Sequence, residues 1–210
     1  PLLNFPEISM WGLYPWGGWG ATALPERITR FWRQTGDKLS GGFLYSEGLF
    51  EDINKVIVAQ LYFWGDRDPD ETLREYAIYE LGMADAAPFL ELVHTLEKTH
   101  TAVATAGMCD LGDVARTYEL ACEIDEALPQ WAKRCFRWRQ IFLRAVLDSR
   151  RYPACFARFG KMRVDDEDWK ALLREDEVCI EAFRELVGIY HSVDDFEEDP
   201  YHRRVRPLLS

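Results

Sequence analysis

Apolar residues recur at helical spacing along most of the chain, and alternation of apolar and polar residues typical of strands is absent. The pattern predicts a mainly α fold, a bundle-like domain of about six or seven helices preceded by a loop-rich aromatic N-terminal segment. The helices are expected over residues 25–36, 49–64, 68–82, 88–104, 110–128, 130–163 and 165–200.

Caps and breakers place the ends of two of these helices. Pro25 stands at a first-turn position, and Gly36 ends the short helix that it opens. Asp68 is a capping residue before Pro69, and Gly82 follows the last apolar position of the next helix. Between them, the apolar positions of residues 49–64 cover more than half of a helix circumference, so this helix should be central.

The last two regions carry opposite charge. Residues 130–163 hold ten Lys or Arg and one acidic residue, whereas residues 165–200 hold fourteen Asp or Glu and three Lys or Arg. Each region also has an apolar stripe, so an antiparallel pair of helices is expected. The arginines could form an anion site, but ion pairs laid over a buried seam explain them better.

The composition divides the chain into two parts and excludes several classes of protein. Residues 1–48 are rich in glycine, proline and tryptophan, whereas residues 49–210 are helical, which gives the expected domain boundary. With 48% hydrophobic and 29% charged residues, the chain is neither disordered nor fibrous. A net charge of −11 disfavours a nucleic-acid partner. The longest nearly apolar run, residues 56–64, is far short of the ~20 residues of a membrane span.

Familiar catalytic and metal-binding motifs are absent from the sequence. It contains no phosphate-binding glycine loop, no G-x-S-x-G and no H-E-x-x-H, and His94 and His100 fall on different faces of a helix. No cofactor and no metal are therefore expected. The five cysteines are odd in number and widely spaced, which predicts free thiols. No signal peptide opens the given chain, and the localisation stays open.

The N-terminal segment carries the functional signal. Trp11, Trp16 and Trp19 lie among glycines, and such rigid rings stack on the apolar faces of sugars. Carboxylates and amides bind sugar hydroxyls, so the candidate substrate-binding residues are Glu7, Trp11, Trp16, Trp19, Glu47 and Asn54. Composition alone favours the plainer interpretation that the tryptophans pack against the helices.

Several runs carry a resemblance to a known class of enzyme. Residues 4–10 (NFPEISM), 15–21 (PWGGWGA) and 45–55 (YSEGLFEDINK) resemble the end of a bacterial glycoside-hydrolase-type (β/α)8 barrel. Residues 64–82 and 138–148 are similar to the helical region that follows such barrels. Together these runs touch about a third of the chain.

The resemblance implies a contribution to a sugar site that the chain does not complete. Residues 4–10 would correspond to a late barrel strand, and residues 45–55 to a loop and helix that close the barrel. The resemblance also implies that Tyr45 is a substrate-binding residue, beside Glu7 and Glu47. A barrel needs about 250 residues, and its catalytic groups come from several strand ends, so the acid and base would lie upstream in the parent. The implied partners are a weakly bound carbohydrate and the missing upstream barrel, and the parent would be secreted or periplasmic.

Two other classes of function stay open at this point. The chain could be a self-contained helical interaction module whose aromatic segment docks a protein partner or a second copy of the chain. It could also be a small independent hydrolase with Glu7 and Glu47 as its two carboxyl groups, since glycoside hydrolysis needs such a pair.

Overall fold

The computed structural model describes residues 2–6, 22–45 and 52–190. Of these residues, 76% lie in helices and 3% in strands, which confirms the mainly α fold. The elements are β1 (Leu3–Asn4), α1 (Pro25–Thr35), η1 (Gly36–Lys38), β2 (Gly41–Gly42), α2 (Asp52–Trp64), α3 (Pro69–Leu81), α4 (Ala87–Ala106), α5 (Leu111–Ala127), α6 (Gln130–Lys133), α7 (Phe136–Phe159), α8 (Asp166–Arg174) and α9 (Glu177–Tyr190).

Helix α3 begins and ends where its capping residues predict. The Asp68 carboxylate accepts a hydrogen bond from the Asp70 amide at 2.9 Å. At the other end Gly82 has a φ of 68°, a left-handed conformation that a residue with a side chain rarely adopts. The local sequence therefore fixes both ends of this helix.

The described residues form nine α-helices, more than the six or seven expected. The basic region begins with the separate four-residue helix α6, because Cys135 has extended backbone. The acidic region divides into α8 and α9, because the Asp176 carboxylate accepts from the amides of Val178 and Cys179 and so caps a new helix. The part of the expected acidic helix beyond residue 190 lies outside the described residues.

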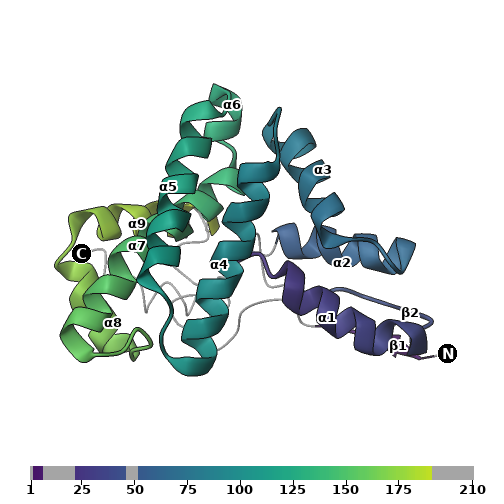
Figure 1. Cartoon of the computed structure of the whole chain (residues 1–210), viewed down its shortest axis with the longest axis horizontal. Helices are drawn as coiled ribbons and strands as arrows, with labels where there is room; N and C mark the ends of the chain where they lie inside the picture. The colour runs from purple at the N-terminus through teal and green to yellow at the C-terminus, as the bar shows by residue number, and fades with distance from the viewer. Residues whose placement is uncertain (1, 7–21, 46–51, 191–210) are drawn as a thin grey trace.

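The helices form a row with the two strands at one end. In Figure 1, β1, β2 and α1 lie at one end, α8 and α9 at the other, and α4, α5 and α7 between them. Helix α4 packs on α5, α5 on α7, and α7 on α9. Helices α1, α2 and α3 pack on one another, and α1 and α3 also pack on α4. None of the helices described here has the length and apolarity to cross a membrane.

Helices α7 and α9 form the antiparallel pair that the charge pattern predicts. Arg139, near the start of α7, pairs with Glu185 of α9 at 2.6 Å, and Arg150, further along α7, pairs with Asp176 just before α9. These arginines lie over a buried apolar seam, so the ion-pair interpretation of the basic region holds for them.

We predict that stability at the start of α7 depends on the buried core around Trp138 much more than on surface charge. Trp138 is fully buried, and its indole N–H donates to Asp125 at 2.8 Å, so Trp138→Ala should lower the free energy of unfolding by ~3–5 kcal/mol. Arg137 pairs with Asp52 at the half-exposed edge, so Arg137→Ala should cost about 1 kcal/mol or less. Urea denaturation of both variants measures the difference, and equal losses would contradict the prediction.

Candidate functional site

The two short strands β1 and β2 pair with each other next to the segments that are expected to bind sugar. Strands β1 and β2 are parallel, and the pairing continues beyond their carboxyl ends. The Phe43 amide donates to the Asn4 carbonyl at 3.0 Å, and the Tyr45 amide donates to the Pro6 carbonyl at 3.1 Å. The Phe5 and Tyr45 rings lie 5.4 Å apart. Residues 5–6, which follow β1, therefore lie beside residues 43–45, which follow β2.

Helix α2 holds this strand pair in place. The Tyr62 hydroxyl donates to the side-chain oxygen of Asn4. A Cβ added to Gly42 would meet that same oxygen at 2.0 Å and the Tyr62 hydroxyl at 2.5 Å. Only glycine lets β2 approach β1 and α2 this closely.

Most of the sugar-binding residues expected from the sequence lie outside the described residues. These are Glu7, Trp11, Trp16, Trp19 and Glu47. Tyr45 is described, and 38% of its surface is exposed. Along the chain, Glu7 follows Pro6 directly and Glu47 comes two residues after Tyr45.

Asn54, the remaining candidate, is buried in the core. Its side-chain oxygen accepts from the Leu24 amide at 2.8 Å, and its side-chain nitrogen donates to the Thr22 carbonyl at 3.1 Å. The amide is thus engaged at both ends by residues 22–24, which we call the stem. In this position Asn54 binds the protein's own backbone, and its amide is not offered to a sugar.

A buried polar network holds the stem from the other side. Arg144 of α7 is fully buried, donates to the Thr22 hydroxyl and pairs with Asp148 at 2.5 Å. Its remaining nitrogen lies 2.9 Å from Nδ1 of His100. Because a guanidinium only donates, Nδ1 of His100 accepts, and the neutral ring carries its proton on Nε2.

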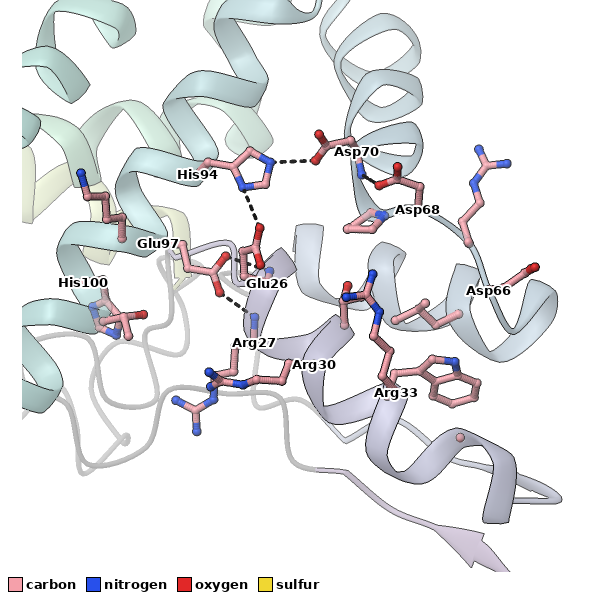
Figure 2. Close-up of a pocket in the computed structure, with 18 of the residues that line it drawn as sticks. Glu26, Arg27, Arg30, Arg33, Asp66, Asp68, Asp70, His94, Glu97 and His100 are labelled. Atoms are coloured by element: carbon pink, nitrogen blue, oxygen red, sulfur yellow. Dashed lines mark hydrogen bonds and ion pairs between the residues drawn. The ribbon is translucent and has the colours of Figure 1, made fainter.

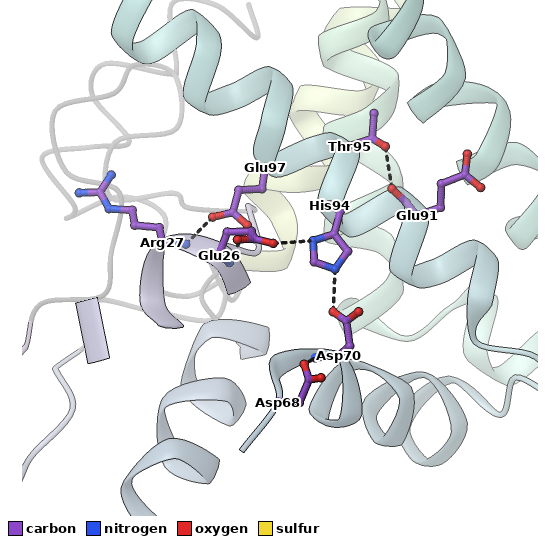
Figure 3. A network of polar contacts seen from close by, with 8 residues as sticks. All are labelled: Glu26, Arg27, Asp68, Asp70, Glu91, His94, Thr95 and Glu97. Atoms are coloured by element: carbon purple, nitrogen blue, oxygen red, sulfur yellow. Dashed lines mark hydrogen bonds and ion pairs between the residues drawn. The ribbon is translucent and has the colours of Figure 1, made fainter. Parts of the chain in front are cut away.

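Glu97 of α4 caps helix α1 from outside the local sequence. Leu24, at the capping position, offers no side-chain oxygen, and the Glu97 carboxylate instead accepts from the amides of Glu26 and Arg27 at 2.9 and 2.8 Å (Figure 3). Burial raises the pKa of Glu97, and these two hydrogen bonds oppose the shift. The start of α1 is therefore bound to α4.

An open groove of about 1410 Å³ lies between α1, the α2–α3 connection and α4 (Figure 2). On its wall, Nε2 of His94 lies 2.7 Å from the Asp70 carboxylate, and Nδ1 lies 3.9 Å from that of Glu26 (Figure 3). Arg27, Arg30 and Arg33 of α1 also line the groove.

The described groove wall carries charged and polar side chains and no metal-binding cluster. Among the residues described, no group of three or more His, Cys, Asp or Glu side chains could hold a metal ion. The five cysteines are free thiols, and none of them lines the groove. His94 is engaged by the carboxylates of Asp70 and Glu26.

Sequence reasoning missed the groove arginines. Their spacing of three residues within an expected helix places Arg27, Arg30 and Arg33 along one side of it, and that signal was available. The contribution of His94 was not, since its partners come from α1 and α3.

Comparison of the chain with models of protein families, with curated proteins and with solved structures gives no match.

The buried His100 predicts a specific loss of stability in mild acid. Burial, together with the charges of Arg144, Arg151 and Arg27, lowers the pKa of His100 from 6.5 to about 2. Below pH 6.5 the unfolded chain binds a proton that the folded chain does not, so stability falls as the pH falls from 6.5 towards 2. At pH 5 this difference amounts to about 2 kcal/mol.

Urea denaturation of the wild type and His100→Gln at pH 7.5 and pH 5 measures this contribution. The stability of the wild type relative to the variant should be about 2 kcal/mol lower at pH 5 than at pH 7.5. The same difference between the two proteins at both pH values would contradict the prediction.

Proposed function

We propose that the chain is the C-terminal helical domain of a glycoside-hydrolase-like, carbohydrate-active protein, and that it contributes to sugar binding without being catalytically complete. The observation that carries this proposal is the order β1–α1–β2–α2 with β1 parallel to β2. Alternation of parallel strands with helices is the repeat of a (β/α)8 barrel. The same segments carry the sequence resemblance to the end of such a barrel.

The exposed face of the strand pair supports the proposal. The exposed fractions of Leu3, Phe5 and Phe43 are 59%, 64% and 67%. Parallel sheets are normally covered on both faces, and a pair of two-residue strands has little stability of its own. Further strands and helices of a parent barrel would cover these side chains.

The direction of the strands supports a shared ligand site. In folds with parallel strands, ligands bind beyond the carboxyl ends of the strands. Pro6 and Tyr45 lie side by side at that end, and the chain continues from them directly to Glu7 and to Ser46-Glu47. The tryptophan-rich segment joins Pro6 to the stem, so the expected sugar-binding groups would gather at the same edge of the sheet.

We predict weak sugar binding and no turnover by this chain. An open aromatic surface should give a dissociation constant near millimolar, equivalent to roughly 4 kcal/mol, and a neutral oligosaccharide panel followed by tryptophan fluorescence measures it. Trp16→Ala or Trp19→Ala should abolish binding without lowering the melting temperature. Aryl glycosides should not be hydrolysed detectably, because two positioned carboxyl groups are needed and the upstream strands supply them.

Trp131→Ala is the matched control, because Trp131 is an exposed tryptophan on α6, well away from the strands (Figure 1). It should leave binding unchanged. Loss of stability in the Trp16 and Trp19 variants would instead place those rings in the core. Turnover that disappears in Glu7→Gln or Glu47→Gln would favour an independent hydrolase.

A second candidate function is pairing of two copies of the chain. The large side chains of Phe63, Trp64 and Tyr79 are exposed on α2 and α3, with exposed fractions from 58% to 77%. Light scattering measures the molar mass of the chain and of the double variant Phe63→Ser, Tyr79→Ser, and so tests whether two copies of the chain pair. A dimer that the double variant dissociates would favour the interaction module.

A further inference from the structure

Three arginines give one side of the groove a positive charge, although the protein as a whole is acidic. Arg27, Arg30 and Arg33 line the groove from α1, spaced three residues apart. Successive members are therefore about 4.5 Å apart along the helix axis. Figure 2 shows the Arg27 and Arg30 side chains extending together from α1, with Asp66 on the far side of the groove.

The three guanidinium groups are without partners within the described part of the chain, where none of them forms a hydrogen bond or an ion pair. Other cations that line the groove are neutralised. Lys98 pairs with Asp113 at 2.6 Å, and Arg67 pairs with Glu75 at 2.6 Å. With 36 acidic residues in the chain, acceptors are plentiful, so three free guanidiniums on one face are a distinctive feature.

Three of the carboxylates that line the groove are already engaged. Glu97 accepts from the first amides of α1, which also closes the helix N-terminus to an anion. Asp70 binds His94, and Asp68 caps α3. These three carboxylates therefore serve the fold and do not neutralise the arginines of α1. Asp37 and Asp66 also line the groove, and neither forms an ion pair with those arginines in the described part of the chain.

His100 adds an unpartnered donor to the wall of the groove. It lines the groove, only 5% of its surface is exposed, and Nε2 is buried and has no hydrogen-bond partner among the described residues. Since Nδ1 accepts from Arg144, Nε2 carries the proton and is a donor. Buried polar groups are normally paired, so this atom lacks an acceptor in the same way as the arginines do.

We infer that this groove binds an acidic oligosaccharide, with the carboxylates of its uronic acid units on Arg27, Arg30 and Arg33. The three guanidinium groups and Nε2 of His100 are all hydrogen-bond donors that lack an acceptor in the described part of the chain. A ligand rich in anionic oxygen would supply those acceptors. Guanidinium groups bind carboxylates with two parallel hydrogen bonds. The choice of a sugar acid rests on the proposed function, and the net charge of −11 opposes a long polyphosphate such as a nucleic acid.

The test is calorimetric titration of the whole chain with trigalacturonate and with the neutral trisaccharide in which each carboxylate is reduced to an alcohol. The acidic ligand should bind at least about tenfold more tightly, since several exposed ion pairs each contribute up to about 1 kcal/mol. The double variant Arg27→Gln, Arg30→Gln should lose about that factor for trigalacturonate and leave binding of the neutral sugar unchanged.

The matched control is Arg74→Gln with Arg134→Gln, which removes two exposed arginines outside the groove and changes the net charge equally. It should retain the preference for the acidic sugar. Equal losses in both double variants would show an effect of net charge alone and would overturn the inference. Inorganic sulfate that binds as tightly as trigalacturonate would also overturn it, because the site would then select an anion and no sugar.

The two proposals fail in different ways. Neutral sugar binding that depends on Trp16, with no preference for trigalacturonate, would overturn the groove assignment and leave the proposed function standing. Arg27-dependent binding of trigalacturonate, with no neutral sugar binding and no effect of Trp16→Ala, would support the groove and contradict the aromatic site.

Discussion

Burial of the stem, residues 22–24, is the constraint on which the arrangement of the N-terminal half depends. The stem has no regular secondary structure and all three of its residues are buried, where unpaired amides and carbonyls are costly. Asn54 satisfies the Leu24 amide and the Thr22 carbonyl, and Arg144 satisfies the Thr22 hydroxyl. These contacts come from α2 and α7, which are ninety residues apart in sequence. The stem is therefore fixed by the finished helical domain, and α1 begins from a position that the domain sets.

The ends of the helices could be predicted from the sequence wherever a local cap decides them. Asp68 and Gly82 bound α3 as expected, because both act on their own turn of helix. The break between α8 and α9 was missed, since Asp176 stands in an acidic run that looks continuous and only its hydrogen bonds show it to be a cap. The cap of α1 could not have been predicted at all, because it comes from Glu97, some seventy residues further along the chain.

The side chains of the candidate site, like the helix ends, could be predicted only where neighbouring residues in the sequence decide their contacts. The role of Asn54 could not be derived from the sequence, because a side-chain amide near a loop can hydrogen-bond either to a sugar or to the protein backbone. The basic region, residues 130–163, drew attention because it holds ten basic residues, yet arginines there are paired with acids of α9 and of neighbouring elements. The arginines of α1 are fewer and were overlooked, although all three line the groove and have no partner in the described part of the chain. Partners decide whether an arginine is available to a ligand, and charge density in the sequence does not reveal them.

The contacts of α1 and α2 explain why a strand pair this short needs a helical domain. Two strands of two residues each bury too little apolar surface to hold their register alone. Here α2 supplies Tyr62 to Asn4 of β1, and α4 supplies Glu97 to the start of the helix between the strands. The carboxyl ends of β1 and β2 and the arginine face of α1 are thus both held in place by contacts from the helical domain. A ligand surface that extended from the strand ends to the groove would be held rigid by the same buried polar contacts, so the helical domain would set its geometry even where it does not touch the ligand.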